Sequence, residues 1–346
     1  MTTAGSLNAQ GGIVGIQSAV TSLNRNFKSP LAVNYVIGVE HQLPWQLVAG
    51  ANYSGSRSCD GLTGTDINRC DGCATVTAGG ENISRLNSSF GSIDYVTNSN
   101  AATYNSVILT LRGRAGDRGN FQASYILSHS KDYPEAGTRF DQDAGQNIPD
   151  PTAYFNYYGD ANWDVRNRFS LSGTYTIPGL HAGIGRTLTS GWELTSIAAI
   201  QSGTPFWVIN NLPLTAGGDY NADGVGYDVP DAPAANFTGS HSRSAYVNGL
   251  FTAADFPAPT AGTEGNLQRN TYRNPGLIQV DASVLKNNHI RWLGEQGTLQ
   301  FRFDFLNVLN HVNLGSVDNF MGDTNFGKVT SALSARQLQL GARISF

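Results

Sequence analysis

Charge is scarce in this sequence. Asp, Glu, Lys and Arg together make up 14% of the 346 residues, and the formal net charge is −4. A soluble domain usually carries about 25% of these residues. Because no basic cluster stands out from this near-neutral background, the composition argues against a nucleic-acid-binding protein.

Long apolar runs are also missing. No stretch of about 18 apolar residues occurs, so a membrane-spanning helix is excluded. Residues 1–6 lack the basic start and apolar stretch of a secretory signal peptide. An aromatic content of 10%, in contrast, argues against a disordered chain.

Cysteine is rare, with three residues in one polar stretch: Cys59, Cys70 and Cys73. The spacing of Cys70 and Cys73 suits a metal, but no second Cys-x-x-Cys or His pair follows, so zinc is disfavoured. We expect a disulfide from Cys59 to Cys70 or Cys73 that closes a surface loop and leaves one thiol spare. A disulfide indicates an oxidising compartment, which conflicts with the missing signal peptide.

Alternation of apolar and polar residues with period two is the dominant pattern. It is clearest in residues 168–177, 298–305 and 337–346. Strict alternation is typical of a sheet with one apolar and one polar face. About nine segments carry it between turn-forming residues. They lie near residues 31–40, 45–54, 102–113, 120–130, 164–177, 191–202, 275–286, 297–309 and 336–346.

The lengths of the strands and of their connections indicate a membrane barrel. Several segments have about ten residues, which suffices to cross a bilayer, whereas soluble strands usually have about five or six. Short connections at 41–44, 114–119, 178–190 and 287–296 alternate with long polar ones at 55–101, 131–163, 203–274 and 310–335. We therefore predict an all-β fold, an antiparallel transmembrane β-barrel segment of about nine or ten long strands with short periplasmic turns and long extracellular loops. A soluble sandwich or propeller is the alternative.

Several short segments carry a family resemblance. Asn-Phe-Lys-Ser-Pro at 26–30, Val-Ile-Gly-Val-Glu at 36–40 and Leu-Pro-Trp at 43–45 resemble a strand pair that Asn-Tyr-Ser-Gly-Ser-Arg at 52–57 closes. Further matching segments are 163–169, 274–276, 303–311, 326–332 and 335–341. As an ordered set, they are similar to TonB-dependent outer-membrane receptors of the Oar-like type, which carries an N-terminal carboxypeptidase-regulatory domain.

The resemblance implies an incomplete barrel. Members of that family have about 22 strands around a plugged lumen, so residues 31–346 would be the C-terminal portion of the barrel and residues 1–30 an irregular lead-in or partial strand. The export signal, the plug and the TonB box would lie on a missing part, which resolves the conflict over the compartment. Expected partners are outer-membrane lipid, the plug and remaining strands, the TonB system and the barrel-assembly machinery. The expected location is the outer membrane of a Gram-negative-type bacterium.

The implied activity is ligand capture and energised uptake with no enzymatic step. An adhesin or passive pore of the same architecture is the first alternative, and a secreted all-β binding module or enzyme is the second. The sequence contains no catalytic signature such as H-E-x-x-H, G-x-S-x-G or a P-loop. We therefore assign no catalytic residue.

One long connection contains half of a calcium-binding loop. Such loops place oxygen ligands at alternate positions, with glycine at the sharp turn. The candidate ligands are Asp219, Asn221, Asp223 and Asp228. The closing glutamate is missing, because its position holds Pro230. Calcium would order this loop and shape an extracellular gate; a polar turn is the alternative. No other cofactor is expected.

Two further features concern the strands. Charged residues on polar strand faces are predicted to face the lumen, since lipid would disfavour them. They are Arg166, Arg168, Asp281, Arg302, Asp304 and Arg343. The terminal Phe346, at the end of an alternating strand, resembles the signal that the barrel-assembly machinery reads.

Overall fold

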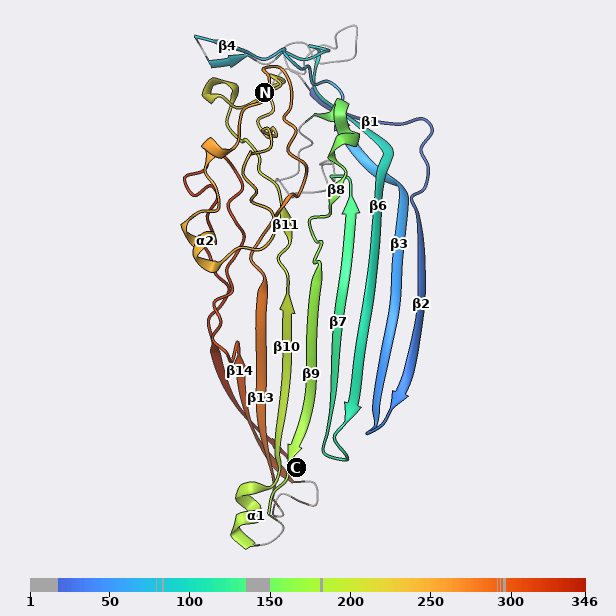
Figure 1. Ribbon diagram of the computed structural model, residues 1–346, viewed down its shortest axis with the longest axis vertical. Coiled ribbons are helices and arrows are strands. Elements are labelled where there is room, and N and C mark those ends of the chain that lie inside the picture. The colour runs from blue at the N-terminus through green and yellow to red at the C-terminus, as the bar shows by residue number, and fades with distance from the viewer. Residues whose placement is uncertain are drawn as a thin grey trace, which may run out of the picture.

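The structure is built around one large sheet whose strands run along the long axis of the molecule (Figure 1). A computed structural model describes residues 18–78, 80–82, 84–134, 150–180, 183–290, 292, 294 and 297–346. The first part of the predicted lead-in, residues 1–17, lies outside the described residues. No helix in the described part of the chain is long and apolar enough to cross a membrane.

Nine strands form an antiparallel meander, in which each strand pairs with the next strand of the path. They are β2 (Leu31–Leu43), β3 (Leu47–Asp66), β6 (Phe90–Arg114), β7 (Gly119–Asp132), β9 (Asn167–Ile177), β10 (Trp192–Gln201), β13 (Leu277–His289), β14 (Thr298–Leu306) and β15 (Gln337–Ser345). Two short strands complete the 11-stranded sheet. β1 (Ser18–Leu23) pairs in parallel with β6, and β8 (Gly159–Asp160) pairs with β7.

All nine predicted segments are strands, and the shortest have 9 residues. β3 and β6 are longer than predicted, with 20 and 25 residues. They stay paired beyond the alternating part, from Gly61 opposite Asn100 to Asp66 opposite Asp94. This extension is rich in Ser, Thr and Asn, so backbone pairing continues where the apolar pattern has ended.

The strand register separates apolar from polar side chains. Paired residues on neighbouring strands point to the same side of a sheet, as do residues two apart. One face therefore carries Phe169, Leu171, Leu194, Ile200, Val280, Val284, Phe303, Leu338, Leu340 and Ile344. Six of these side chains are exposed, among them Leu340 at 78% and Leu171 at 40%, and the other four are partly exposed. An apolar face of this extent indicates contact with lipid or another protein.

The two ends of the sheet differ in their connections. At the lower end in Figure 1 the links are residues 44–46, 115–118, 178–191, which include α1 (Gly183–Thr189), and 290–297. At the upper end lie the long connections 67–89, 133–166, 202–276 and 307–336. These hold β4 (Thr75–Thr77), β5 (Gly80–Asn82), η1 (Pro151–Tyr157), β11 (Pro205–Phe206), η2 (Leu214–Ala216), α2 (Arg243–Asn248), η3 (Ala253–Asp255) and β12 (Tyr272–Arg273). The predicted alternation of short and long links is confirmed.

The sheet does not close. β2 and β15 stand at the two ends of the strand order, and neither has a further neighbour among the described residues. Every residue of β2 is exposed, as is all of β15 except Ser345. The described fold is therefore an incomplete barrel.

Candidate functional site

The hydrophobic core lies in the long connections and not between strands of the meander. Its fifteen buried side chains come from three of these connections, which we call the loop assembly. They are Tyr154, Tyr157, Phe206, Trp207, Val208, Ile209, Val229, Tyr246, Phe251, Phe256, Leu267, Tyr272, Val317, Phe326 and Val329. Phe251 lies at the centre of an aromatic group, with its ring centroid 5.1 Å from those of Phe256 and Phe326. The loop assembly is thus a packed layer with a core of its own.

Backbone hydrogen bonds join the separate connections of the loop assembly. The N–H of Ile209 donates to the carbonyl of Asn319 at 3.1 Å, and the N–H of Met321 donates to the carbonyl of Ile209 at 2.9 Å. The N–H of Val329 donates to the carbonyl of Tyr246 at 2.9 Å. Connection 307–336 is therefore paired with connection 202–276, and this fixes the relative position of their side chains.

Buried ion pairs hold the loop assembly to the rim of the sheet. Arg269 donates to Asp132, at the end of β7, with 2.6 Å between Nη1 and Oδ1. Arg273 donates to Asp160 of β8 and, at 2.8 Å, to Asp164. All of these carboxylates lie on or beside the β7–β9 connection. Sequence reasoning missed this network because its partners are more than 100 residues apart.

The predicted calcium residues lie together and are buried, and each residue has 2% or less of its surface exposed. Asp219 accepts hydrogen bonds from the N–H groups of Asp223 and Gly224, both at 2.9 Å. Asp223 accepts from the N–H of Val225 at 2.8 Å and is paired with Arg69. Most of these oxygens are thus occupied in capping a turn, the alternative foreseen from the sequence. Among the described residues, no group of three or more His, Cys, Asp or Glu side chains is arranged to hold a metal.

Asp228 differs from the other three residues. Its Oδ2 accepts from the N–H of Tyr220, and its side chain is hydrogen-bonded to that of Glu264. Glu264 Oε2 accepts from the N–H of Val229 at 2.8 Å. Burial, and then repulsion by neighbouring carboxylates, raises the pKa of Asp228 to about 7 and that of Glu264 to about 9. No pattern in the sequence points to Glu264.

An acidic cavity of about 560 Å³ opens beside this pair. Its lining includes Asp71, Asp150 and Glu264, together with Tyr157 and the segment 262–268. No Lys, Arg or His of the described part of the chain lines it. Burial and then the charge of Asp150 raise the pKa of Asp71, while burial above all raises the pKa of Tyr157. The chemistry of this cavity therefore favours cations or hydrogen-bond donors.

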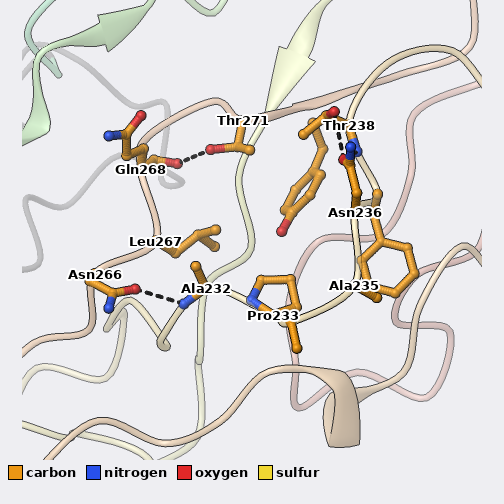
Figure 2. A pocket seen from close by; sticks show the side chains of 12 residues that line it. Ala232, Pro233, Ala235, Asn236, Thr238, Asn266, Leu267, Gln268 and Thr271 are labelled. Carbon is orange, nitrogen blue, oxygen red and sulfur yellow. Dashed lines mark hydrogen bonds between the residues drawn. The ribbon is translucent and has the colours of Figure 1, made fainter.

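A second cavity of about 400 Å³ shares part of this segment (Figure 2). Its wall combines the apolar side chains of Pro233, Phe237, Leu267 and Tyr272 with a few polar groups. Asn266 accepts from the N–H of Ala232 at 2.8 Å, which joins its two sides. Residues 266–268 line both cavities, so any shift of this segment changes both.

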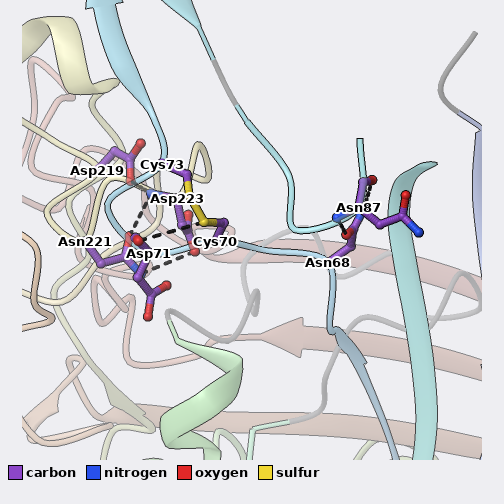
Figure 3. The surroundings of a disulfide bond; sticks show 8 residues. All are labelled: Asn68, Cys70, Asp71, Cys73, Asn87, Asp219, Asn221 and Asp223. Atoms are coloured by element: carbon purple, nitrogen blue, oxygen red, sulfur yellow. Dashed lines mark hydrogen bonds between the residues drawn. A yellow bond between two sulfur atoms is a disulfide. The ribbon is translucent and has the colours of Figure 1, made fainter. Parts of the chain in front are cut away.

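The structure corrects the predicted disulfide. Cys70 is bonded to Cys73, whereas Cys59 is exposed and free. Cys59 lies within β3 opposite Leu31 in β2, while Cys70 and Cys73 close a tight turn with their Cα atoms 5.4 Å apart. This turn lies against the buried acidic residues (Figure 3), and the N–H of Gly72 donates to the carbonyl of Asn221 at 2.7 Å.

The predicted lumen-facing charges are mostly on one face. The register places Arg168, Asp281, Arg302, Asp304 and Arg343 on the face opposite the apolar one. Arg166 is an exception, because it precedes β9 and lies 3.9 Å from Asp160 near the rim. Phe346 follows β15 and is 92% exposed. The lumen contacts of the charges and the assembly role of Phe346 stay predictions.

An amphipathic antiparallel meander with long strands, short links at one end and long loops at the other defines an outer-membrane β-barrel protein. Residues 2–339 match the family described as outer membrane beta barrel domain, and the chain belongs to this family. The protein is therefore located in the outer membrane, with the apolar face toward lipid and the loop assembly on the extracellular side.

Two solved structures match this chain. The outer membrane transporter YddB from Escherichia coli is 13% identical, with a TM-score of 0.53 over 95% of this chain and 34% of that one. The ferric citrate transporter FecA in the unliganded form is 12% identical, with a TM-score of 0.41 over 91% of this chain and 31% of that one. The chain thus spans about a third of the length of either structure. No curated protein matches it in sequence.

Proposed function

We propose that this chain forms barrel wall and extracellular loops of a TonB-dependent receptor-transporter of the Oar-like type. The loops capture a ligand from the medium, and energy transmitted by TonB admits it through the barrel. The observation that carries this proposal is the loop assembly, which packs fifteen buried side chains around two cavities at the extracellular end. The function is binding and transport without an enzymatic step.

A packed loop assembly favours capture over passive diffusion. Ligand sites are concave and largely preformed, with an apolar wall and a few fixed polar groups. The cavity between Pro233 and Tyr272 has this composition, and the hydrogen bonds and ion pairs described above fix its wall. A passive pore has no need of such an arrangement. The outer membrane transporter YddB, which has a similar fold, supports the same class.

The open sheet supports a larger barrel. Across eight successive antiparallel pairings, β2 and β15 run in the same direction. Antiparallel closure therefore requires an odd number of additional strands. A second copy would supply nine strands, which is an odd number. If both copies crossed the membrane in the same direction, however, β15 of one copy would lie parallel to β2 of the other. A barrel of about 22 strands leaves an odd remainder, as required. We therefore propose that these edges pair with further strands of the same receptor around a plug.

Two measurements on the intact gene product, purified from outer membranes, test this function. A plugged receptor is expected to give no steady conductance in a planar lipid bilayer and to bind the periplasmic domain of TonB. A stable open conductance without TonB binding would show a passive pore. Absence of both conductance and TonB binding would indicate an adhesin, and either result overturns the proposal.

A further inference from the structure

Two basic side chains lie in one row across the lipid-facing side of the sheet, near its extracellular end. The register pairs Arg57 of β3 with Thr103 of β6, and Thr103 with Lys131 of β7, on three strands that lie side by side (Figure 1). Tyr125 lies opposite Phe169 of the apolar face. Lys131 follows Tyr125 by an even number of residues in the same strand, so the row lies on that face too. We call Arg57, Thr103 and Lys131 the basic row.

Tyrosine hydroxyls mark the level at which the apolar part of this face ends. Tyr35 and Tyr53 both donate to Oδ1 of Asn105, at 3.2 and 2.7 Å. Tyr125 donates to Oδ1 of Asn167 at 2.6 Å. A tyrosine ring in an apolar surface with a hydrogen-bonded hydroxyl is typical of the boundary between hydrocarbon and lipid headgroups. These hydrogen bonds therefore place that boundary close to Asn105 and Asn167.

The basic row lies at the depth of the headgroups. Thr103 is separated from Asn105 by one residue of β6 on the extracellular side, which corresponds to about 7 Å along the strand. With a strand tilt of about 45°, the row lies about 5 Å above Asn105 along the membrane normal. The headgroup layer on either side of the hydrocarbon is about 5–8 Å thick. The basic side chains therefore start within the layer that contains the lipid phosphates.

Neither cation of the basic row is neutralised within the described part of the chain. Arg57 is exposed and Lys131 is partly exposed, and neither forms an ion pair with a described residue. Asp160 lies opposite Lys131 in the register. Its carboxylate, however, is paired with Arg273 and lies 2.7 Å from Nε2 of His129. Both basic side chains are therefore available to an anion from outside the chain.

We infer that the basic row binds the phosphate groups of lipid headgroups in the outer leaflet. Arg57 can bind two phosphate oxygens at once through its planar fork, and Lys131 acts as a point charge. Between them, Oγ1 of Thr103 lies 3.0 Å from the hydroxyl of Tyr158. One of these two hydroxyls donates to the other, so the second hydrogen is free to donate to a phosphate oxygen. The inference does not rest on the transport proposal.

A lipid fits this position better than a free anion, because the basic row continues directly into apolar surface. On the same strands, Val107 and Leu127 lie below the row on the membrane side and are 42% and 44% exposed. A phosphate that is attached to acyl chains contacts both the basic row and this apolar surface, whereas inorganic phosphate contacts the row alone. Such binding would fix the height of the rim in the membrane and, with it, the height of the loop assembly.

The test titrates the intact gene product in detergent with lipid A that carries both phosphates and with the same lipid after dephosphorylation, and native mass spectrometry gives the dissociation constants. Wild type is expected to bind the phosphorylated lipid at least fivefold more tightly. Arg57→Gln and Lys131→Gln should each bind it about fivefold more weakly and should bind the dephosphorylated lipid as wild type does. Arg343→Gln is the matched control, because it removes an exposed arginine from the opposite face; we expect less than a twofold change.

The dephosphorylated lipid guards against misfolded variants, since it reports on the apolar surface alone. Equal affinity of wild type for the two lipids, or unchanged binding of the phosphorylated lipid by both variants, overturns the inference. An equal loss of both lipids in the variants also overturns it, because the row would then act through the fold. Inorganic phosphate at 10 mM, with ionic strength matched by chloride, should not displace the lipid; displacement would show a site for free anions and overturn the inference. None of these readouts depends on conductance or TonB binding.

Discussion

Arg269 donates to Asp132 at 2.6 Å across 137 residues of chain, and their side chains are only 1% and 5% exposed. Arg269 belongs to the connection that contains both cavities, whereas Asp132 ends β7 at the rim of the barrel. Together with the ion pairs of Arg273, this ion pair therefore joins the loop assembly to the sheet. The pair is buried, so removal of one partner leaves the other charge uncompensated.

Arg269→Gln is expected to destabilise the attachment of the loop assembly by about 3–5 kcal/mol, because Asp132 would remain buried and unpaired. Limited proteolysis of connection 202–276 under increasing urea measures this change. Arg302→Gln is the control, since its pair with Asp304 leaves the Arg302 side chain 56% exposed. Exposed pairs contribute about 0–1 kcal/mol. Similar urea midpoints for both variants would contradict the assigned role of Arg269.

Phe251→Ala should unfold the loop assembly locally and leave the sheet folded. The Phe251 ring contacts Phe206, Phe256, Tyr272 and Phe326, and deletion of a buried aromatic ring typically costs about 3–5 kcal/mol. We expect rapid trypsin cleavage in the loops with an unchanged β-sheet circular dichroism spectrum. Leu340→Ala, which removes a 78% exposed side chain from the lipid face, should leave loop cleavage unchanged. Loss of β-sheet signal in Phe251→Ala would show that the two layers fold as one.

The loop assembly should lose stability as pH rises. The folded-state pKa values of Asp228 and Glu264, about 7 and about 9, exceed the ordinary values of 3.8 and 4.5. Between these limits the folded state binds more protons than the unfolded state, so stability falls with increasing pH. In EDTA, the urea midpoint of loop proteolysis should be higher at pH 5 than at pH 8, and Glu264→Gln should reduce the difference. A midpoint that rises equally with pH in both proteins would refute this assignment.

Thiol labelling can verify the cysteine assignment. In the unreduced protein, a maleimide should react with Cys59 alone, because Cys70 and Cys73 are bonded to each other. After denaturation and reduction, all three cysteines should react. Cys59→Ser should abolish labelling of the unreduced protein, and Cys70→Ser should add a labelled thiol at Cys73. Labelling of wild type at Cys70 or Cys73 before reduction would exclude the observed pairing.

The strands could be predicted from the sequence, and the loop assembly could not, for one physical reason. A strand between lipid and water repeats its environment every two residues, so Leu338, Leu340 and Ile344 report their face locally. The core of the loop assembly has no period: Trp207 and Phe326 share a cluster but belong to different connections. Glu264 lies 36 residues after Asp228 in the sequence, and only the fold brings the two side chains together. The lengths of β3 and β6 were underestimated because the prediction follows the alternation of apolar residues. Their backbone pairing continues beyond that alternation.

The two open edges give the strongest prediction about this chain by itself. Among the described residues, the edges of β2 and β15 have no partner strand, and lipid cannot hydrogen-bond their N–H and C=O groups. The 346-residue chain alone should therefore not form a stable inserted barrel. Refolded in detergent, it should migrate identically on gels with and without boiling and should aggregate with time. The intact gene product, prepared in parallel, should show the heat-dependent mobility of a closed barrel. A heat-modifiable, detergent-stable monomer of this chain alone would mean that β2 and β15 close on one another, against the parallel direction in which they run.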